Sequence, residues 1–413
     1  MPNHFLKDLI NCSSAQFVCG DINLCFNFLH FDSRLIQKNC GFLAMVGESQ
    51  DGHDYIDKAI ENGANLIIAE KKVKVASHVT LVIAKSALDV LQTYAKWYRE
   101  TKLKTYIIGI TGSVGKTSTK DCMSQLIGQD LCYSSEGNYN NFLGLPICLL
   151  KMEENQKYGI FEAGISTPNE MELLGKILQP NMMIVTNIFQ SHMEFFDSHS
   201  KLVKEKLKLS KQMRTGSILI LPKKYEQEAR DDLKVITFDH LIPQKKQIEK
   251  IGFGPSISFE LSKIAIKYLE IEVSLDNEIA MTPLRMQRCI KKGQNFLLDC
   301  YNASPESMSA LFLSVSNVNE CIFILGDMLE LGVNKEEVHL RVLSDLLKLK
   351  PKKICLFGEI FSKAYEKLEK NSIDIKKYQR IDDVISELHI LESECIVIKG
   401  SRFFALEKIY QKY

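Results

Sequence analysis

The stretch from Tyr106 to Ser118, Tyr-Ile-Ile-Gly-Ile-Thr-Gly-Ser-Val-Gly-Lys-Thr-Ser, decides the fold class. Its first five residues form an apolar run typical of a buried strand, and a glycine-rich turn and a helical pattern follow at once. A phosphate-binding loop requires that order, because glycines let backbone N–H groups turn toward the phosphates and the helix start adds donors and a favourable dipole. The strict G-x-x-x-x-G-K-[ST] spacing is not met, since position 110 is Ile. A chance Gly-Lys-Thr in an ordinary turn is the alternative, which the preceding strand disfavours.

We therefore expect a nucleotide site at this loop. Lys116 is predicted to reach the β- and γ-phosphates, and the Thr117 hydroxyl is suited to a magnesium ligand position. The predicted ATP-binding loop residues are Gly112, Ser113, Val114, Gly115, Lys116, Thr117 and Ser118.

Strand-like and helical patterns alternate on both sides of the loop. Apolar runs at 160–162, 183–185 and 218–221 have helical patterns between them, which predicts a parallel, doubly wound central sheet. Further runs at 296–299, 322–325, 354–357 and 396–398 indicate a third unit. Short runs at 67–68 and 81–83 precede a helical pattern over 87–100. We predict three α/β domains, at 1–101, 102–283 and 284–413, while the polar stretch 222–250 receives no assignment.

Length, composition and charge agree with a multidomain globular chain. The 413 residues suggest about three domains. With 45% hydrophobic and 25% charged residues, the chain is not mainly disordered, and a net charge of +1 argues against a strongly basic nucleic-acid-binding protein. The 12 cysteines include no Cys-x-x-Cys pair, so free thiols in a reducing compartment are the simplest interpretation. The first residues lack a signal-peptide pattern and the apolar runs are too short to span a bilayer, so we expect a cytoplasmic protein without membrane insertion.

A phosphate loop indicates a nucleotide but not a reaction. A switch GTPase or a motor ATPase is one possibility, yet the sequence has no Asn-Lys-x-Asp base-reading element. No apolar strand near the loop ends in the Asp of a Walker B element. The run Tyr158–Phe161 ends instead in Glu162, whose carboxylate is predicted to hold Mg²⁺ facing the loop.

Several strings together resemble the Mur ligase family, which makes peptidoglycan precursors. The resemblance covers about residues 30 to 402, and its strings are Asp32-Ser33-Arg34, Asp51-Gly52-His53, Thr111–Thr117, Gly137-Asn138-Tyr139-Asn140-Asn141, Glu162-Ala163-Gly164, Thr186-Asn187 with His192, Tyr301-Asn302-Ala303-Ser304-Pro305, Gly326–Gly332 and Lys399-Gly400-Ser401-Arg402. The last three strings resemble the branch that adds D-alanyl-D-alanine. No Asp-Asn-Pro-Arg element of the diaminopimelate- or lysine-adding branch is present.

The resemblance implies a fold and a reaction. It implies a central P-loop ATPase-type parallel sheet between an N-terminal UDP-sugar-binding α/β domain and a C-terminal Rossmann-like domain. The implied reaction is ATP-dependent amide ligation of D-alanyl-D-alanine to UDP-N-acetylmuramoyl tripeptide through an acyl phosphate, with ATP, two Mg²⁺ ions and a monomeric enzyme. A sister Mur ligase, a folylpolyglutamate synthase-like ligase and a P-loop switch without ligation remain the alternatives.

The resemblance also implies roles for individual residues. The catalytic set is Lys116, His192, Lys206 and Arg285. The metal ligands are Thr117, Glu162, His192 and Lys206, the last if carbamylated. Arg285, Asp299, Tyr301 and Asn302 join the loop in binding ATP. The UDP-sugar and substrate set is Ser33, Arg34, Asp51, His53, Asn138, Asn140, Asn141, Asp327, Lys399, Ser401 and Arg402.

Two positions depart from the family pattern. Phe259 falls where members have an Asn that reads adenine, and Leu284 replaces the Gly that precedes Arg285. The stretch 239–260 is also shorter than in typical members. Adenine recognition is therefore expected to use stacking or backbone groups.

Overall fold

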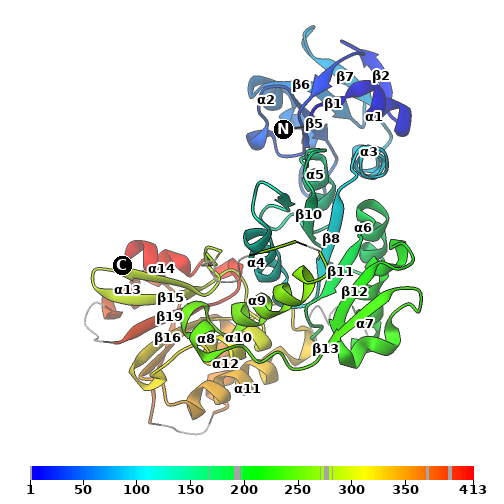
Figure 1. Ribbon diagram of the computed structural model, residues 1–413. Helices are drawn as coiled ribbons and strands as arrows, with labels where there is room; N and C mark the ends of the chain where they lie inside the picture. Colours follow the sequence, from blue (N-terminus) through cyan, green and yellow to red (C-terminus); the bar gives the residue numbers. More distant parts are fainter. Residues whose placement is uncertain are drawn as a thin grey trace.

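The computed structural model describes residues 2–165, 167–189, 196, 198–269, 271–273, 279–280, 282–368, 372–388 and 393–413. Each of three α/β units carries its own mainly parallel sheet, and the units follow one another along the chain (Figure 1). The predicted fold class is confirmed. The predicted strands of all three units are present. The unassigned stretch 222–250 contains strand β13 (Lys234–Phe238) and all but the last residue of helix α8 (Lys245–Ile251).

The central unit is built around strand β8, which lies in the sheet order β13-β12-β11-β8-β10-β9 with every pair parallel. Its strands are β8 (Tyr106–Thr111), β9 (Cys132–Ser134), β10 (Tyr158–Glu162), β11 (Met182–Val185), β12 (Ile218–Pro222) and β13. Its helices are α4 (Lys116–Ile127), α5 (Gly144–Leu150), α6 (Glu170–Leu178), α7 (His199–Leu207), α8 and α9 (Phe253–Ile266). The chain places β10 on one side of β8 and then β11 on the other side. This reversal opens a crevice at the carboxyl end of β8, where doubly wound sheets bind ligands.

The C-terminal unit has the sheet order β14-β15-β19-β16-β17-β18, with only the β14–β15 pair antiparallel among the described strands. Its strands are β14 (Gln287–Lys291), β15 (Gln294–Asp299), β16 (Cys321–Gly326), β17 (Lys353–Phe357), β18 (Asp374–Tyr378) and β19 (Cys395–Lys399). Its helices are α10 (Pro305–Phe312), α11 (Lys335–Lys348), α12 (Glu359–Glu366), α13 (Ile381–Leu388) and α14 (Glu407–Lys412). Asp299 and Lys399 are register partners at the carboxyl ends of adjacent strands.

The N-terminal unit has the sheet order β2-β7-β6-β5-β4 and a separate β1-β3 ribbon. Its strands are β1 (His4–Phe5), β2 (Gln16–Cys19), β3 (Cys25–Phe26), β4 (Leu29–His30), β5 (Cys40–Ala44), β6 (Ala64–Ala69) and β7 (Thr80–Ile83). Its helices are α1 (Leu6–Cys12), α2 (Ile56–Glu61) and α3 (Ala87–Thr101). The Ser86 side chain caps α3 by accepting from the Asp89 N–H.

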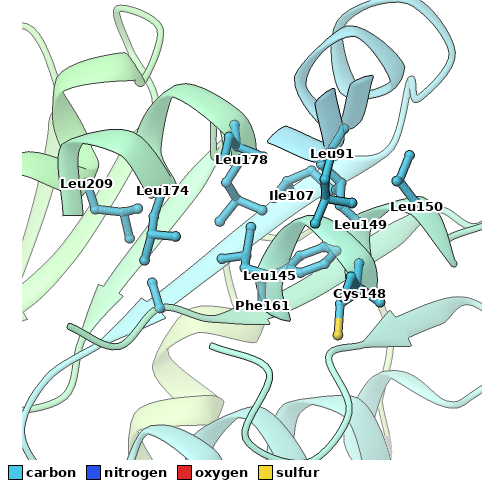
Figure 2. Packing of buried hydrophobic residues seen from close by; sticks show 14 of the residues in the cluster. Leu91, Ile107, Leu145, Cys148, Leu149, Leu150, Phe161, Leu174, Leu178 and Leu209 are labelled. Atoms are coloured by element: carbon cyan, nitrogen blue, oxygen red, sulfur yellow. The ribbon is translucent and has the colours of Figure 1, made fainter. Parts of the chain in front are cut away.

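Helix α3 joins the N-terminal unit to the central one through a continuous apolar core. Leu91 of α3 packs beside Leu145 and Leu149 of α5 and Leu178 of α6 (Figure 2). These side chains are fully or almost fully buried. Because the core runs through both units, apolar burial favours one fixed arrangement of the two.

A buried histidine adds polar contacts to this junction. His4 Nε2 lies 2.7 Å from the Leu150 carbonyl oxygen, and Nδ1 lies 3.0 Å from the Tyr94 hydroxyl. A carbonyl only accepts, so Nε2 carries the proton and Nδ1 accepts from Tyr94. Burial is the main cause that lowers the pKa of His4 to about 4.

This histidine is expected to make the junction acid-sensitive. The unfolded chain binds a proton near pH 6.5 whereas the folded chain does so only near pH 4, so stability falls as pH drops through that window. The loss is about 3 kcal/mol once both states are protonated. Calorimetric melting of wild type and His4→Gln at pH 7.5, 5 and 4 tests this. An equal acid shift in both proteins would contradict it.

All twelve cysteines lie in the described residues and are free thiols; seven are buried, whereas Cys19 and Cys25 are exposed. Over the part of the chain that the structure describes, no helix combines the length and apolar character needed to cross a membrane.

Candidate active site

A cavity of about 440 Å³ lies between the central and C-terminal units. The phosphate loop, Glu162 and Lys206 line it from the central unit, and Asp299 and Lys399 line it from the C-terminal unit. Of the other predicted site residues, the lining includes Ser113, Val114, Gly115, Lys116, Thr117, Ser118, Asn138, Asn140, Asn141, Arg285, Tyr301 and Asn302. The structure therefore brings together most of the residues predicted for ATP.

The phosphate loop has the backbone that its glycines predict. Gly112 has φ +144° and Gly115 has φ +85°, both in the region that favours glycine. A Cβ at Gly112 would lie 2.0 Å from Thr186 Oγ1 at the end of β11. The Thr186 hydroxyl donates to the Val114 carbonyl at 2.7 Å, and the Ser113 N–H donates to the Asn187 carbonyl at 2.7 Å. The end of β11 thus holds the loop before it enters α4.

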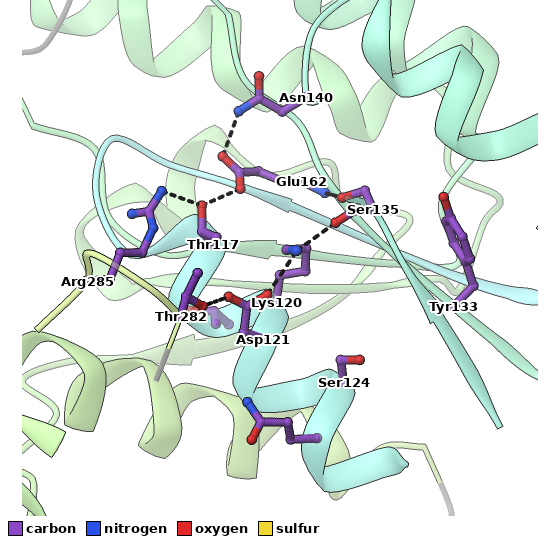
Figure 3. A network of polar contacts seen from close by, with 12 residues as sticks. Thr117, Lys120, Asp121, Ser124, Tyr133, Ser135, Asn140, Glu162, Thr282 and Arg285 are labelled. Carbon is purple, nitrogen blue, oxygen red and sulfur yellow. Dashed lines mark hydrogen bonds and ion pairs between the residues drawn. The ribbon is translucent and has the colours of Figure 1, made fainter. Parts of the chain in front are cut away.

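Thr117 and Glu162 form the polar centre of the cavity (Figure 3). The Thr117 hydroxyl donates to Glu162 Oε2 at 2.6 Å, and Asn140 Nδ2 donates to Oε1 at 2.7 Å. The Glu162 N–H in turn donates to Ser135 Oγ at 3.1 Å. Glu162 is only 4% exposed, so these donors offset the cost of burying its carboxylate. Thr117 and Glu162 together place hard oxygen donors at the N-terminus of α4.

Two lysine amines lie beside the loop. Lys116 Nζ donates to the carbonyl oxygens of Gly112 and Ser113 at 3.1 and 3.2 Å, and Lys206 Nζ donates to Gly112 at 3.1 Å. Burial first, and then the neighbouring Lys116 ammonium, lower the pKa of Lys206 to about 7. Burial also lowers the pKa of Lys116, against the opposing effect of Glu162. This arrangement favours a polyanion, because a triphosphate would relieve the repulsion between the lysines.

Arg285 connects the two units across the cavity. Its guanidinium carbon lies 3.9 Å from the centre of the Tyr301 ring, and Nη2 donates to the Thr117 hydroxyl at 3.0 Å. A cation stacked on an aromatic face is held in a defined plane. Arg285 therefore contacts the loop helix while resting on a ring of the C-terminal unit.

Asp299 and Lys399 form a buried ion pair on the C-terminal side. Lys399 Nζ donates to Asp299 and to the Asn302 carbonyl, the latter at 3.0 Å, and Lys399 is 1% exposed. The Met286 N–H donates to Asp299 Oδ1 at 3.2 Å. The pair thus fixes the turn that carries Tyr301 and Asn302.

The substrate residues predicted in the N-terminal unit lie apart from this cavity. The exposed Arg34 side chain pairs with Asp32, and Ser33 is buried. Asp51 accepts from Lys71 at 2.6 Å, and His53 Nε2 accepts from the Glu70 N–H at 3.1 Å. The Lys71 ammonium is the main reason that the pKa of Asp51 lies well below its usual range. A contact toward the cavity runs from His30 Nε2 to the Tyr139 hydroxyl at 3.1 Å, next to Asn140.

Four further predicted residues are described and lie outside the cavity lining. Gly112 precedes the lining part of the phosphate loop, and its carbonyl accepts from Lys116 and Lys206. The carboxylate of Asp327 accepts from the Ile360 and Phe361 N–H groups at 3.0 and 2.8 Å and so caps α12. Ser401 is buried, and Arg402 pairs with Glu407 at 2.5 Å. His192 lies outside the described residues.

Sequence comparisons identify the family to which this site belongs. Models of the Mur ligase family match along the chain: the catalytic domain at 26–99, the middle domain at 110–276 and the glutamate ligase domain at 284–402. The UDP-N-acetylmuramoyl-tripeptide–D-alanyl-D-alanine ligase of Rickettsia prowazekii is 31% identical over 94% of this chain and 95% of its own. The chain belongs to the Mur ligase family. The ligase of the same name from Bacillus subtilis is 27% identical over 92% of this Mur ligase and 91% of its own chain.

Solved structures share the fold of this Mur ligase. MurF from Acinetobacter baumannii superposes with a TM-score of 0.86 at 21% identity, over 100% of this chain and 99% of its own. MurF from Thermotoga maritima, solved in complex with ADP, gives 0.81 at 22% identity over 93% and 96%.

Some residues of this Mur ligase site were not predicted from the sequence. Lys120 is 5% exposed and donates to the Ser135 carbonyl at 2.6 Å, one helical turn after Lys116. The i, i+4 spacing from Lys116 was a usable signal. Leu329 and Glu330 line the cavity and lie in the string Gly326–Gly332, but only Asp327 of that string was given a role. Ser135 gave no signal, because its place depends on how distant strands and loops meet.

Proposed function

We propose that this Mur ligase uses ATP to join D-alanyl-D-alanine to UDP-N-acetylmuramoyl tripeptide. The main support is the cavity, where a phosphate loop faces Arg285, Asp299 and Tyr301 of the next unit. The Rickettsia prowazekii and Bacillus subtilis relatives carry the name of that activity and match nearly the whole chain. The product would be the pentapeptide precursor of peptidoglycan.

The proposed reaction has two steps. A carboxylate oxygen of the tripeptide attacks the γ-phosphorus of ATP, and the bond to the β-phosphate oxygen breaks to give an acyl phosphate and ADP. The D-alanyl-D-alanine amine then attacks the acyl carbon, loses a proton and expels phosphate, leaving an amide. The tripeptide carboxylate and the ATP triphosphate are both negatively charged and must come together. Lys116 and Arg285 would therefore neutralise the transferring phosphoryl group and align it. Closure of the C-terminal unit would exclude water from the acyl phosphate.

A magnesium ion fits the residues that are present. The Thr117 hydroxyl and the Glu162 carboxylate are the oxygen donors that Mg²⁺ prefers, and their 2.6 Å contact places them at one point of the loop. The described residues contain no cluster of three His, Cys, Asp or Glu side chains that would bind a metal alone. Substrate phosphates would join these two oxygen donors in the shell. Bound there, Mg²⁺ would neutralise charge on the phosphates. His192 and a carbamylated Lys206 remain proposed ligands, with two ions in all.

The remaining roles are also proposals. Asp299, Tyr301 and Asn302 would contact the nucleoside, and Asn138, Asn140 and Asn141 would guide the muramyl peptide from the N-terminal unit. There Ser33, Arg34, Asp51 and His53 would hold the UDP-sugar, while Lys399, Ser401 and Arg402 would act on the peptide side. Asp327 would support that side through α12, whose first N–H groups its carboxylate binds. A monomeric, cytoplasmic enzyme is part of the same proposal. The boundaries at 101/102 and 283/284 stay a prediction.

Product analysis tests the proposal. We expect mass spectrometry to detect the pentapeptide adduct and equimolar ADP only when ATP, UDP-muramyl tripeptide and D-alanyl-D-alanine are all present. Single amino acids and glutamate should not replace the dipeptide, which separates this activity from sister and folylpolyglutamate ligases. Phosphate release that ignores both acceptors would refute the ligase function and favour a P-loop switch.

A further inference from the structure

The segment that leads into the C-terminal unit is bound along the phosphate-loop helix. We call residues 279–280 and 282–285 the linker; they precede β14. Gln125 of α4 makes two bonds with Ala280: Nε2 donates to the carbonyl at 2.9 Å, and Oε1 accepts from the N–H at 2.7 Å. The Thr282 hydroxyl donates to Asp121, and Arg285 donates to Thr117 at 3.0 Å.

The three helix residues share one face of α4. Positions 117, 121 and 125 are each four apart, so their side chains project from the same side of the helix. Their partners run in reverse order, at 285, 282 and 280, so the linker lies antiparallel to α4. Figure 3 shows Thr282 beside Asp121 and Arg285 beside Thr117. We call Thr117, Asp121 and Gln125 the anchor stripe.

The far side of the linker is held by the C-terminal unit. Leu284 and Met286, on either side of Arg285, have φ +62° and +52°, a region that is unfavourable for a residue with a Cβ. Such conformations persist where surrounding contacts determine them. The Leu284 carbonyl accepts from the Tyr301 N–H at 3.2 Å, and the Met286 N–H donates to Asp299. Arg285 is therefore positioned from both units.

Only the first contact of the stripe involves a nucleotide-site residue. The Thr117 oxygen accepts from Arg285, and the proposed function assigns that oxygen to a cation. Arg285 would give up this contact when it reaches the transferring phosphate. Asp121, Gln125 and their linker partners are not part of the cavity lining. Their contacts would therefore persist when the nucleotide binds and would keep the linker on α4.

We propose that Asp121 and Gln125 are positioning residues, which hold the linker on α4 so that Arg285 reaches the transferring phosphate. This inference rests on the proposed ligase function and concerns its chemical step. Asp121 also pairs with Lys120 at 2.9 Å, so replacing it would disturb a second contact. The test variants therefore change its linker partner Thr282, and Gln125. Thr282→Val removes the hydroxyl at nearly constant shape, Gln125→Ala removes the amide, and Thr282→Ser restores the hydroxyl.

The test compares full-length wild type with the Thr282→Val/Gln125→Ala double variant. We expect kcat for ligation to fall on the order of tenfold to a hundredfold, as a misplaced reacting group does. The KM for ATP and the ADP affinity should stay within about twofold. The Thr282→Ser single variant, which retains Gln125, should keep the wild-type kcat. The control variant Gln129→Ala, which removes an exposed glutamine just beyond α4, should do so as well.

Hydrogen exchange gives a readout that does not depend on ligation. The Ala280 amide should exchange slowly in wild type with and without Mg²⁺ and ADP, and faster in the double variant. An unchanged kcat in the double variant, a Thr282→Ser protein as impaired as the double variant, or parallel loss of ADP affinity would each overturn the inference. Absence of ligation by wild type would instead refute the proposed function. Hydrogen exchange of the Ala280 amide would in that case still test whether the linker is bound to α4.

Discussion

Replacing Lys116 by alanine is expected to lower ATP-dependent ligation by about 10²–10³-fold or more. Lys116 Nζ is held by two carbonyls of the loop, Gly112 and Ser113, so its charge already lies where the phosphates would bind. A preorganised cation needs no rearrangement as negative charge shifts in the transition state. The alanine methyl group supplies neither charge nor donor.

The fold should survive this substitution. Burial lowers the pKa of Lys116, so the ammonium is a cost to the folded state that alanine removes. The measurement is ADP release and product formation, with melting temperature as the check on folding. Lys246→Ala, which removes an exposed lysine of α8, is the matched control. Turnover equal to wild type in Lys116→Ala would exclude the role assigned to the loop.

The central part of the fold could be predicted because its signals are local. The run Tyr106–Ile110 and the turn after it fixed a strand, a loop and a helix start within a dozen residues. The end of β10 at Glu162 was also readable, since the apolar run stops at the carboxylate. Parallel sheets place such strand ends at one edge, so Glu162 facing the loop followed from topology.

Contacts between distant segments were beyond local reasoning. Asn140 was assigned to substrate by resemblance, yet its amide donates to Glu162, a contact that depends on how the segment after β9 folds back. The Gln125–Ala280 bonds join residues 155 apart, and no pattern near either one indicates the other. Asp327 follows an apolar strand as a ligand residue would, but the neighbouring α12 start takes its carboxylate. What meets a strand end is decided by tertiary packing.

Lys206→Ala is expected to reduce ligation about 10²–10³-fold, and short carboxylates such as acetate should restore part of it. The residue is 1% exposed and lies beside the loop, where its Nζ donates to Gly112. With a pKa of about 7, a large share of the amine is neutral at neutral pH. A neutral amine attacks CO₂ and loses a proton to give a carbamate, whereas an ammonium has no lone pair to do so. The resulting anion would be a further Mg²⁺ ligand besides Thr117 and Glu162.

The pH and CO₂ dependence separate this role from a structural one. Ligation by wild type should fall as pH drops below about 7, where protonation removes the reactive amine, and bicarbonate should counter the loss near that pH. Lys206→Ala with acetate should lack the bicarbonate effect, because no amine remains. Lys204→Ala changes an exposed lysine of the same helix and should behave as wild type. Wild-type activity in Lys206→Ala would exclude an essential role, and loss of activity without carboxylate rescue would point to the amine itself, acting as a cation on the phosphates.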